Sequence, residues 1–161
     1  MQVLLTESAG EKLLRLEYKE RTSIINFTET GNFKNFNDKV KLFINKHQQK
    51  NELLIVDDIY PLIQSKNKIY EIKDHINLSG YNPLQGPQFI SLTGIYNSPN
   101  GIIVIGLKEG VELNKHEKKV LLKVGAKAYC YNLVSTVIYA VSLGLKIKAV
   151  GIVKSQSPLL Y

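Results

Sequence analysis

The chain has 161 residues, with 21 Lys or Arg against 14 Asp or Glu, which gives a formal net charge of +7 at pH 7. A chain of this length is expected to form one domain over residues 1–161 that folds without disulfides. The single cysteine, Cys130, lies in an apolar stretch and predicts an unreactive core thiol in a reducing compartment, so we expect a cytoplasmic protein. The apolar runs are too short to predict a signal peptide or a membrane span.

The positive charge is almost entirely lysine, since Arg15 and Arg21 are the only arginines. Arginine is the preferred side chain for paired hydrogen bonds to guanine and phosphate, so a lysine excess is a weak sign of nucleic-acid binding. Four lysines gather on one face of a predicted helix without aromatic residues between them, at positions 115, 118, 119 and 123. We therefore expect a solvated surface and no nucleic-acid partner.

The first third of the chain predicts two extended segments, a helix and a buried strand. Residues 13–19 and 23–29 are rich in β-branched and aromatic side chains around a polar turn, which predicts a hairpin. From residue 36 to 49 the apolar side chains recur at helical spacing, with Asp38 in the first turn. A short buried strand is predicted at residues 53–58.

The rest of the chain alternates strands with helices. Strands are predicted at residues 68–74, 101–107, 126–131 and 145–153. One helix begins after Asn114, which can form a capping box with Glu117, and runs to about Gly125. A second helix covers residues 133–143 and ends at Gly144. This alternation predicts α/β units with a mainly parallel core.

Residues 74–87, DHINLSGYNPLQGP, combine two Gly, two Pro, Asp, His and two Asn, which predicts an irregular, turn-rich loop. The stretch resembles a signature of the purine nucleoside phosphorylase family, in its trimeric branch. Residues 121–153 are similar to a C-terminal block of the same family in spacing and apolar pattern. Together the two blocks cover about half of the chain.

The resemblance implies an α/β fold with a mixed sheet flanked by helices, shortened at the N-terminus relative to the family. It implies a homo-oligomer, either a dimer or a trimer, and no cofactor or metal. It also implies that the loop is architectural and lies beside the pocket or near subunit contacts. The loop residues concerned are Asp74, His75, Asn77, Asn82, Pro83, Gly86 and Pro87.

The family's phosphate site has no clear counterpart. The family uses a glycine-rich turn, because glycine lets backbone N–H groups approach an oxyanion closely, yet Gly10 and Gly31 are the only glycines before Gly80. The family's Arg-and-His motif falls on residues 30–36, which contain neither. Its Asn-Ala-Ala-Gly-Gly turn is replaced by a stretch with Asp57 and Asp58, whose charges would repel phosphate.

The family's nucleoside contacts are also altered. Its Met-Ser pair falls on Tyr131 and Asn132, and its Asn or Asp on the last strand falls at or near Ser155. Its purine-binding Glu has a possible counterpart in Glu112, although Glu109 and Glu117 compete for that alignment. The possible ligand pocket therefore comprises Glu112, Tyr131, Asn132, Ser155, Asp57 and Asp58, and no residue is assigned a catalytic role.

Simpler structural roles compete with function for several of these residues. His75 is expected to be a hydrogen-bonded loop histidine, and His47 and His116 to be solvated. Asp57 and Asp58 favour a strand-end turn and cap over an acid/base pair. The histidines and the cysteine lack the spacing of metal ligands.

Three hypotheses follow. The first is a phosphorylase-like pseudoenzyme that binds a purine or nucleoside, or assembles with itself or a partner. The second is an active nucleoside phosphorylase or hydrolase with a rearranged site, in which Glu112, Asp57 or Asp58 converge on one pocket. The third is a basic nucleic-acid-binding protein.

Overall fold

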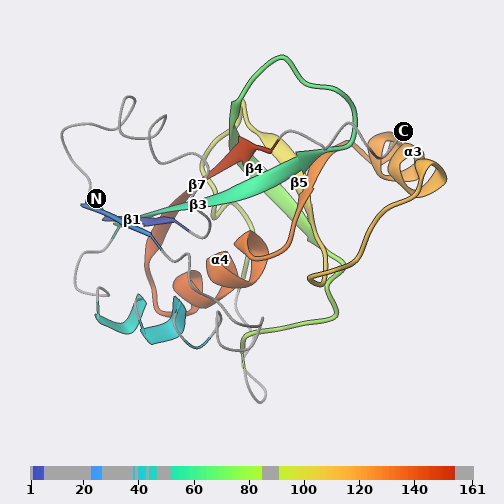
Figure 1. Ribbon diagram of the computed structural model, residues 1–161. Coiled ribbons are helices and arrows are strands. Elements are labelled where there is room, and N and C mark those ends of the chain that lie inside the picture. Colours follow the sequence, from blue (N-terminus) through green and yellow to red (C-terminus); the bar gives the residue numbers. More distant parts are fainter. Residues whose placement is uncertain are drawn as a thin grey trace.

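The computed structural model describes residues 2–5, 23–26, 38, 40–42, 44–46, 52–84 and 91–154. The elements follow one another along the chain as shown in Figure 1: β1 (Gln2–Leu5), β2 (Ser23–Asn26), β3 (Glu52–Pro61), β4 (Ile69–Asn77), β5 (Ile102–Gly106), α3 (Lys115–Lys123), β6 (Ala126–Cys130), α4 (Leu133–Ser142) and β7 (Lys146–Val153). A further helical segment is described at residues 38, 40–42 and 44–46.

Five of the strands close into a ring. β3 pairs in parallel with β7, β7 pairs antiparallel with β4, and β4, β5 and β6 follow in parallel. β6 returns to β3 through an antiparallel pairing of Tyr60 with Tyr129 and Pro61 with Ala128. β1 pairs in parallel with the first half of β3, on the edge of β3 that also pairs with β6 further along. β2 pairs in parallel with the other edge of β1. The sheet is therefore mixed and mainly parallel, which confirms the predicted fold class.

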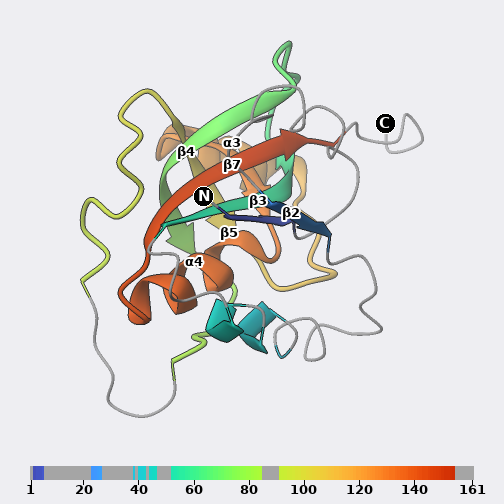
Figure 2. The ribbon, with the colours of Figure 1, turned by 90° about the vertical axis from the view of Figure 1, so that its left-hand side faces the viewer.

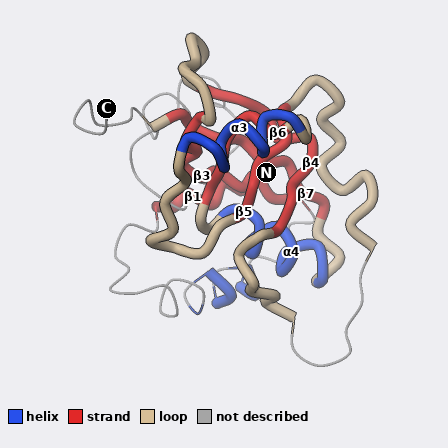
Figure 3. The backbone as a smooth tube through the Cα atoms, turned by 90° about the vertical axis from the view of Figure 1, so that its right-hand side faces the viewer, coloured by secondary structure: helices blue, strands red, loops and turns tan. Residues whose placement is uncertain are grey.

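Two helices cover different sides of the strands. α4 packs against β3, β5 and β7, and seven of its ten residues are buried. Its close approach to the sheet depends on Gly106, because an added Cβ would lie only 2.8 Å from Cγ2 of Val134. α3 packs against β6 and buries none of its residues. Figures 2 and 3 show the strands lying between α3 and α4.

Most of the predicted elements are present. The capping box of α3 is confirmed, with the backbone N–H of Glu117 donating to Oδ1 of Asn114 at 2.9 Å. Gly125 and Gly144 follow the two helices with φ of +97° and +78°, as expected for helix ends. In the helical segment near residue 40, Val40 and Ile44 are buried.

Two predictions about segment ends are wrong. β4 continues through Asn77, so the loop begins at Leu78 and not at Asp74, because residues 74–77 pair with residues 103–106 of β5. β3 continues through Pro61, so Asp57 and Asp58 lie within a strand and not in a turn.

The predicted hairpin is only partly open to comparison. Residues 23–26 are extended, as expected, and pair in parallel with β1, a strand that was not predicted. Residues 13–19, the other predicted arm, lie outside the described residues, as do His47, Gly86, Pro87 and Ser155.

Candidate functional site

The buried carboxylate of Asp57 organises the region where β3 meets α4. Asp57 is 2% exposed, and its Oδ2 accepts hydrogen bonds from the backbone N–H groups of Asn132 at 3.2 Å and Leu133 at 2.9 Å. Its Oδ1 accepts from the backbone N–H of Asp58 at 2.8 Å. Because the first N–H groups of a helix lack intrahelical partners, they attract anions. Asp57 therefore occupies the place at the N-terminus of α4 where an external anion would bind.

The neighbouring Asp58 is equally buried but has a different environment. Successive side chains of a strand point to opposite faces, so the two carboxylates do not form an acid/base pair. Asp58 lies 3.7 Å from Nζ of Lys154, and that ammonium lies 5.8 Å from the ring centroid of Tyr60. Asp57 thus caps a helix that begins 75 residues later, and not the strand-end turn that was predicted.

Three tyrosine rings meet beside these carboxylates. Tyr60 stacks on Tyr129 with ring centroids 5.2 Å apart, and Tyr131 meets both rings edge-on at 5.4 and 6.0 Å. The hydroxyl of Tyr131 donates to the carbonyl of Val111 at 2.9 Å. This contact fixes the segment that carries Glu112 against the cluster. We call Tyr60, Tyr129 and Tyr131 the tyrosine cluster.

Burial raises the pKa of two of the three tyrosines in the cluster. Burial, then the neighbouring Tyr129 and Tyr60, and then the charge of Glu112, raise the pKa of Tyr131 to about 12. Burial and Glu112 also raise the pKa of Tyr129. Glu112 is exposed, and its charge acts on both rings. It therefore lies within electrostatic reach of the tyrosine cluster.

The structure brings most of the predicted pocket residues into one region. Asp57 contacts Asn132 directly, Tyr131 precedes Asn132, and Glu112 lies near Tyr131. Asn132 is 7% exposed, and its Oδ1 has no hydrogen-bond partner among the described residues. An unpaired buried oxygen of this kind lowers stability unless it finds a partner.

Sequence reasoning missed Tyr60, Tyr129 and Lys154 as parts of this region. The proximity of Tyr60 and Tyr129 depends on the antiparallel pairing of β6 with the end of β3, which joins segments almost 70 residues apart. Lys154 is brought to Tyr60 by the parallel pairing of β7 with β3. The alternation of aromatic residues at positions 129 and 131 is the one local signal that could have pointed to a shared face.

Cys130 lies in the same region but is not a nucleophile. The thiol is fully buried and lies 3.6 Å from the carbonyl oxygen of Ile105. Burial and the charge of Asp57 raise its pKa well above the usual value. A thiol that stays protonated is a poor nucleophile, which confirms the expected core role.

The loop after β4 is built by local hydrogen bonds. Oδ1 of Asn77 accepts from the backbone N–H of Ser79 at 3.1 Å, and Oδ1 of Asn82 accepts from the backbone N–H of Leu84 at 3.0 Å. The carbonyl of Pro83 accepts from Nζ of Lys41 at 3.3 Å, which ties the loop to the helical segment near residue 40. These contacts give the described part of the loop a structural role.

His75 also has a structural role, although it lies on β4. Its Nδ1 lies 2.5 Å from the hydroxyl of Tyr96, and the two rings meet edge-on. Burial lowers the pKa of His75, and the charge of Asp74 opposes that shift. His116 is exposed, as expected.

The described residues contain no group of three His, Cys, Asp or Glu side chains that could hold a metal ion. No helix in the described segments is long and apolar enough to cross a membrane. The tyrosine cluster, Asp57, Asn132 and Glu112 define the candidate site on the contacts given above.

Comparison with solved structures identifies the fold. The chain is similar to isoform 2 of purine nucleoside phosphorylase from Schistosoma mansoni, in complex with cytosine and ribose-1-phosphate, with a TM-score of 0.71, 18% identity, and coverage of 94% of this chain and 75% of that one. It is also similar to the Schistosoma enzyme in complex with hypoxanthine, with a TM-score of 0.68, 21% identity, and coverage of 86% and 63%. For the guanosine complex the TM-score is 0.65, at 21% identity with coverage of 76% and 60%.

No protein-family model matches the sequence, and no curated protein matches it by sequence. The chain has the fold of purine nucleoside phosphorylase, as the signature in residues 74–87 indicated. It spans 59% of the Schistosoma mansoni enzyme in complex with BCX-34. The chain therefore shares this fold at low sequence identity and matches only part of the length of these enzymes.

Proposed function

We propose that this protein binds a purine base or nucleoside and does not catalyse phosphorolysis. The observation that carries the proposal is the buried carboxylate of Asp57 at the N-terminus of α4. Phosphorolysis requires a phosphate anion beside the sugar, and a helix N-terminus with free N–H groups is a common place to hold one. Here an internal anion takes both N–H groups, and a second anion close by would be repelled in a poorly screened environment.

The tyrosine cluster supports binding of a planar base. Tyr60 and Tyr131 are half-buried, so part of each ring remains accessible. A purine can stack on such a ring, and base–aromatic stacking contributes about 1–3 kcal/mol. The exposed carboxylate of Glu112 can accept a hydrogen bond from a ring N–H of the base. The solved structures of the same fold with hypoxanthine and guanosine support this ligand class.

The proposal is tested by incubating the purified chain with inosine or guanosine, with and without phosphate, and measuring free base by chromatography. We expect no release of base in either condition, together with saturable nucleoside binding by calorimetry. Release of base that depends on phosphate would overturn the proposal.

The same assay distinguishes the hydrolase alternative, which is favoured by the proximity of Glu112 to the tyrosine cluster. Release of base that is independent of phosphate would indicate hydrolysis by water. In that case Glu112→Gln should abolish turnover. Turnover that survived this substitution would exclude Glu112 as the catalytic group.

We further propose that the protein is a homo-oligomer, either a dimer or a trimer, in the cytoplasm. Six large apolar side chains are exposed among the described residues: Leu42, Ile63, Leu78, Val111, Val120 and Val124. Of these, Val120 and Val124 lie one helical turn apart at the end of α3, and a partner subunit could cover this apolar pair. The lone buried thiol of Cys130 supports a reducing compartment. Light scattering on the purified chain would measure the oligomeric state, and a monomer at all concentrations would contradict the proposal.

A further inference from the structure

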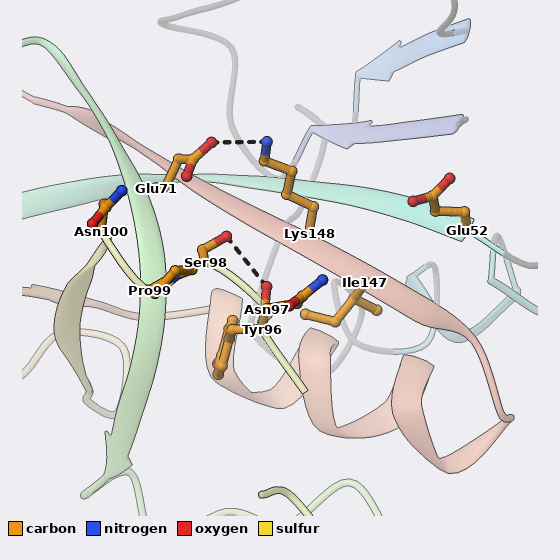
Figure 4. A pocket seen from close by; sticks show the side chains of 9 residues that line it. All are labelled: Glu52, Glu71, Tyr96, Asn97, Ser98, Pro99, Asn100, Ile147 and Lys148. Atoms are coloured by element: carbon orange, nitrogen blue, oxygen red, sulfur yellow. Dashed lines mark hydrogen bonds and ion pairs between the residues drawn. The ribbon is translucent and has the colours of Figure 1, made fainter. Parts of the chain in front are cut away.

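A small polar pocket lies apart from the candidate site, near the start of β3 (Figure 4). Its volume is about 240 Å³, and it is lined by Glu52 of β3, Glu71 of β4, Ile147 and Lys148 of β7, and residues 96–100. Glu52 precedes Asp57 by five residues on the same strand, a span of roughly 17 Å in an extended chain. The pocket is therefore separate from the tyrosine cluster and Asp57.

The wall formed by residues 96–100 is fixed by hydrogen bonds. Tyr96 is 3% exposed and its hydroxyl contacts Nδ1 of His75 at 2.5 Å. Oγ of Ser98 donates to the carbonyl of Tyr96 at 3.2 Å, and the N–H of Gly101 donates to the carbonyl of Ser98 at 3.0 Å. An added Cβ at Gly101 would lie 2.6 Å from the carbonyl oxygen of Glu71, so this wall sits directly on β4. A preformed wall lowers the entropy cost of binding.

The open edge of β7 adds a backbone acceptor to the pocket. The N–H of Val153 donates to the carbonyl of Lys68, so the backbone groups of Val153 point toward β4. The direction of these groups alternates along a strand, and Ile147 lies six residues before Val153. The backbone N–H and C=O of Ile147 therefore also point toward the β4 side. The described pairing of β4 with β7 ends at Val150. The carbonyl of Ile147 therefore faces the pocket.

The charges that line the pocket favour a cation. Oε1 of Glu71 lies 2.7 Å from Nζ of Lys148, so these two charges offset each other. Glu52 makes no ion pair with any of the described residues. Lys146 lies opposite Glu52 in the β3–β7 ladder and offsets part of its charge, although Lys146 does not line the pocket. Among the lining side chains, Glu52 is therefore the carboxylate available to a cation, with the charge of Lys146 beside it.

We propose that this pocket binds a small organic cation with N–H donors, namely a primary ammonium or guanidinium group on a short alkyl chain. The cation lies against the carboxylate of Glu52, and a guanidinium can bind that carboxylate through two parallel hydrogen bonds. The side-chain oxygen of Asn97 and the carbonyl of Ile147 provide further acceptors. In Figure 4, the side chain of Asn97 extends toward Ile147, and Asn100 lies near Glu71.

The test titrates the full chain with n-butylguanidinium, n-butylammonium and butyrate, with binding followed by ligand-observed NMR. We expect saturable binding of the two cations and none of butyrate. Binding of butyrate in place of the cations, or no saturable binding of any probe, would overturn the proposal.

Three charge variants identify the position of the bound cation. Glu52→Gln should weaken binding by about fivefold, as expected for a partly solvated ion pair. Lys146→Gln should strengthen binding, because it removes a repulsive charge beside Glu52. Asp38→Asn removes a similar charge from the exposed side of the helical segment near residue 40 and should have no effect. Equal weakening by Glu52→Gln and Asp38→Asn would show that only net charge matters, and would refute the assigned site.

Discussion

Substitution of Asp57 by Ala tests the role of this carboxylate at the N-terminus of α4. The substitution leaves the backbone N–H groups of Asn132 and Leu133 buried without an acceptor, and it also removes the bond from the N–H of Asp58. A hydrogen bond to a charged group contributes about 1.5–3 kcal/mol, and since the two bonds from α4 share one oxygen we take the lower value for each and treat their sum as a minimum. The expected loss in the free energy of unfolding is about 3 kcal/mol. For a chain of this size, that corresponds to a fall in Tm of roughly 6–12 °C.

Asp57→Asn is the matched control, because it keeps an oxygen acceptor and removes only the charge. We expect it to cost about 1 kcal/mol, so the two variants should differ clearly in urea denaturation. The Ala variant should also gain stability when inorganic phosphate is added, because α4 then offers free N–H groups to an anion. Equal losses for Ala and Asn, with no effect of phosphate on either variant, would refute the capping role.

The remaining predictions concern packing, helix capping and protonation. Gly106→Ala should lower stability by about 2 kcal/mol in urea denaturation, because the new Cβ would collide with Val134; an unchanged midpoint would show that α4 can shift freely. Asn114→Ala should cost about 1 kcal/mol locally and speed amide exchange in α3 but not in β6. Burial raises the pKa of Tyr131 to about 12 from its usual 10.0. Between these two pH values the folded protein keeps a proton that the unfolded chain loses, so the free energy of unfolding should fall from about pH 10 to 12. Because burial lowers the pKa of His75 below 6.5, its stabilising contribution should be present above that pH and be lost on acidification; an NMR titration midpoint above 6.5 would contradict this.

The elements that were predicted correctly are those whose signals are local. The capping box of Asn114 and Glu117 and the glycines after α3 and α4 each act within a few residues, so their effect can be read from the sequence. The buried strands β5, β6 and β7 were also predicted correctly, because short apolar runs of this kind are typical of strands in the interior of a sheet.

The errors arose where distant segments decide the structure. Three of residues 74–77 are polar, so the stretch resembles a loop, but pairing with β5 holds these residues in a strand. Asp57 and Asp58 indicated a turn, because a buried carboxylate needs a partner that the local sequence does not offer. For Asp57 the partner is the first turn of α4, which follows 75 residues later. Propensity alone cannot anticipate contacts of this kind.

The most direct test of the proposed function is a thermal-shift titration of the wild-type chain with guanosine, hypoxanthine and phosphate, each alone and in combination. A ligand at a hundred times its Kd should stabilise the fold by about 2.7 kcal/mol, which is a shift of several degrees for this chain length. We predict a shift with guanosine or hypoxanthine, no shift with phosphate, and no increase when phosphate is added to the nucleoside. A larger shift with nucleoside and phosphate together would show a working phosphate site and contradict the proposal.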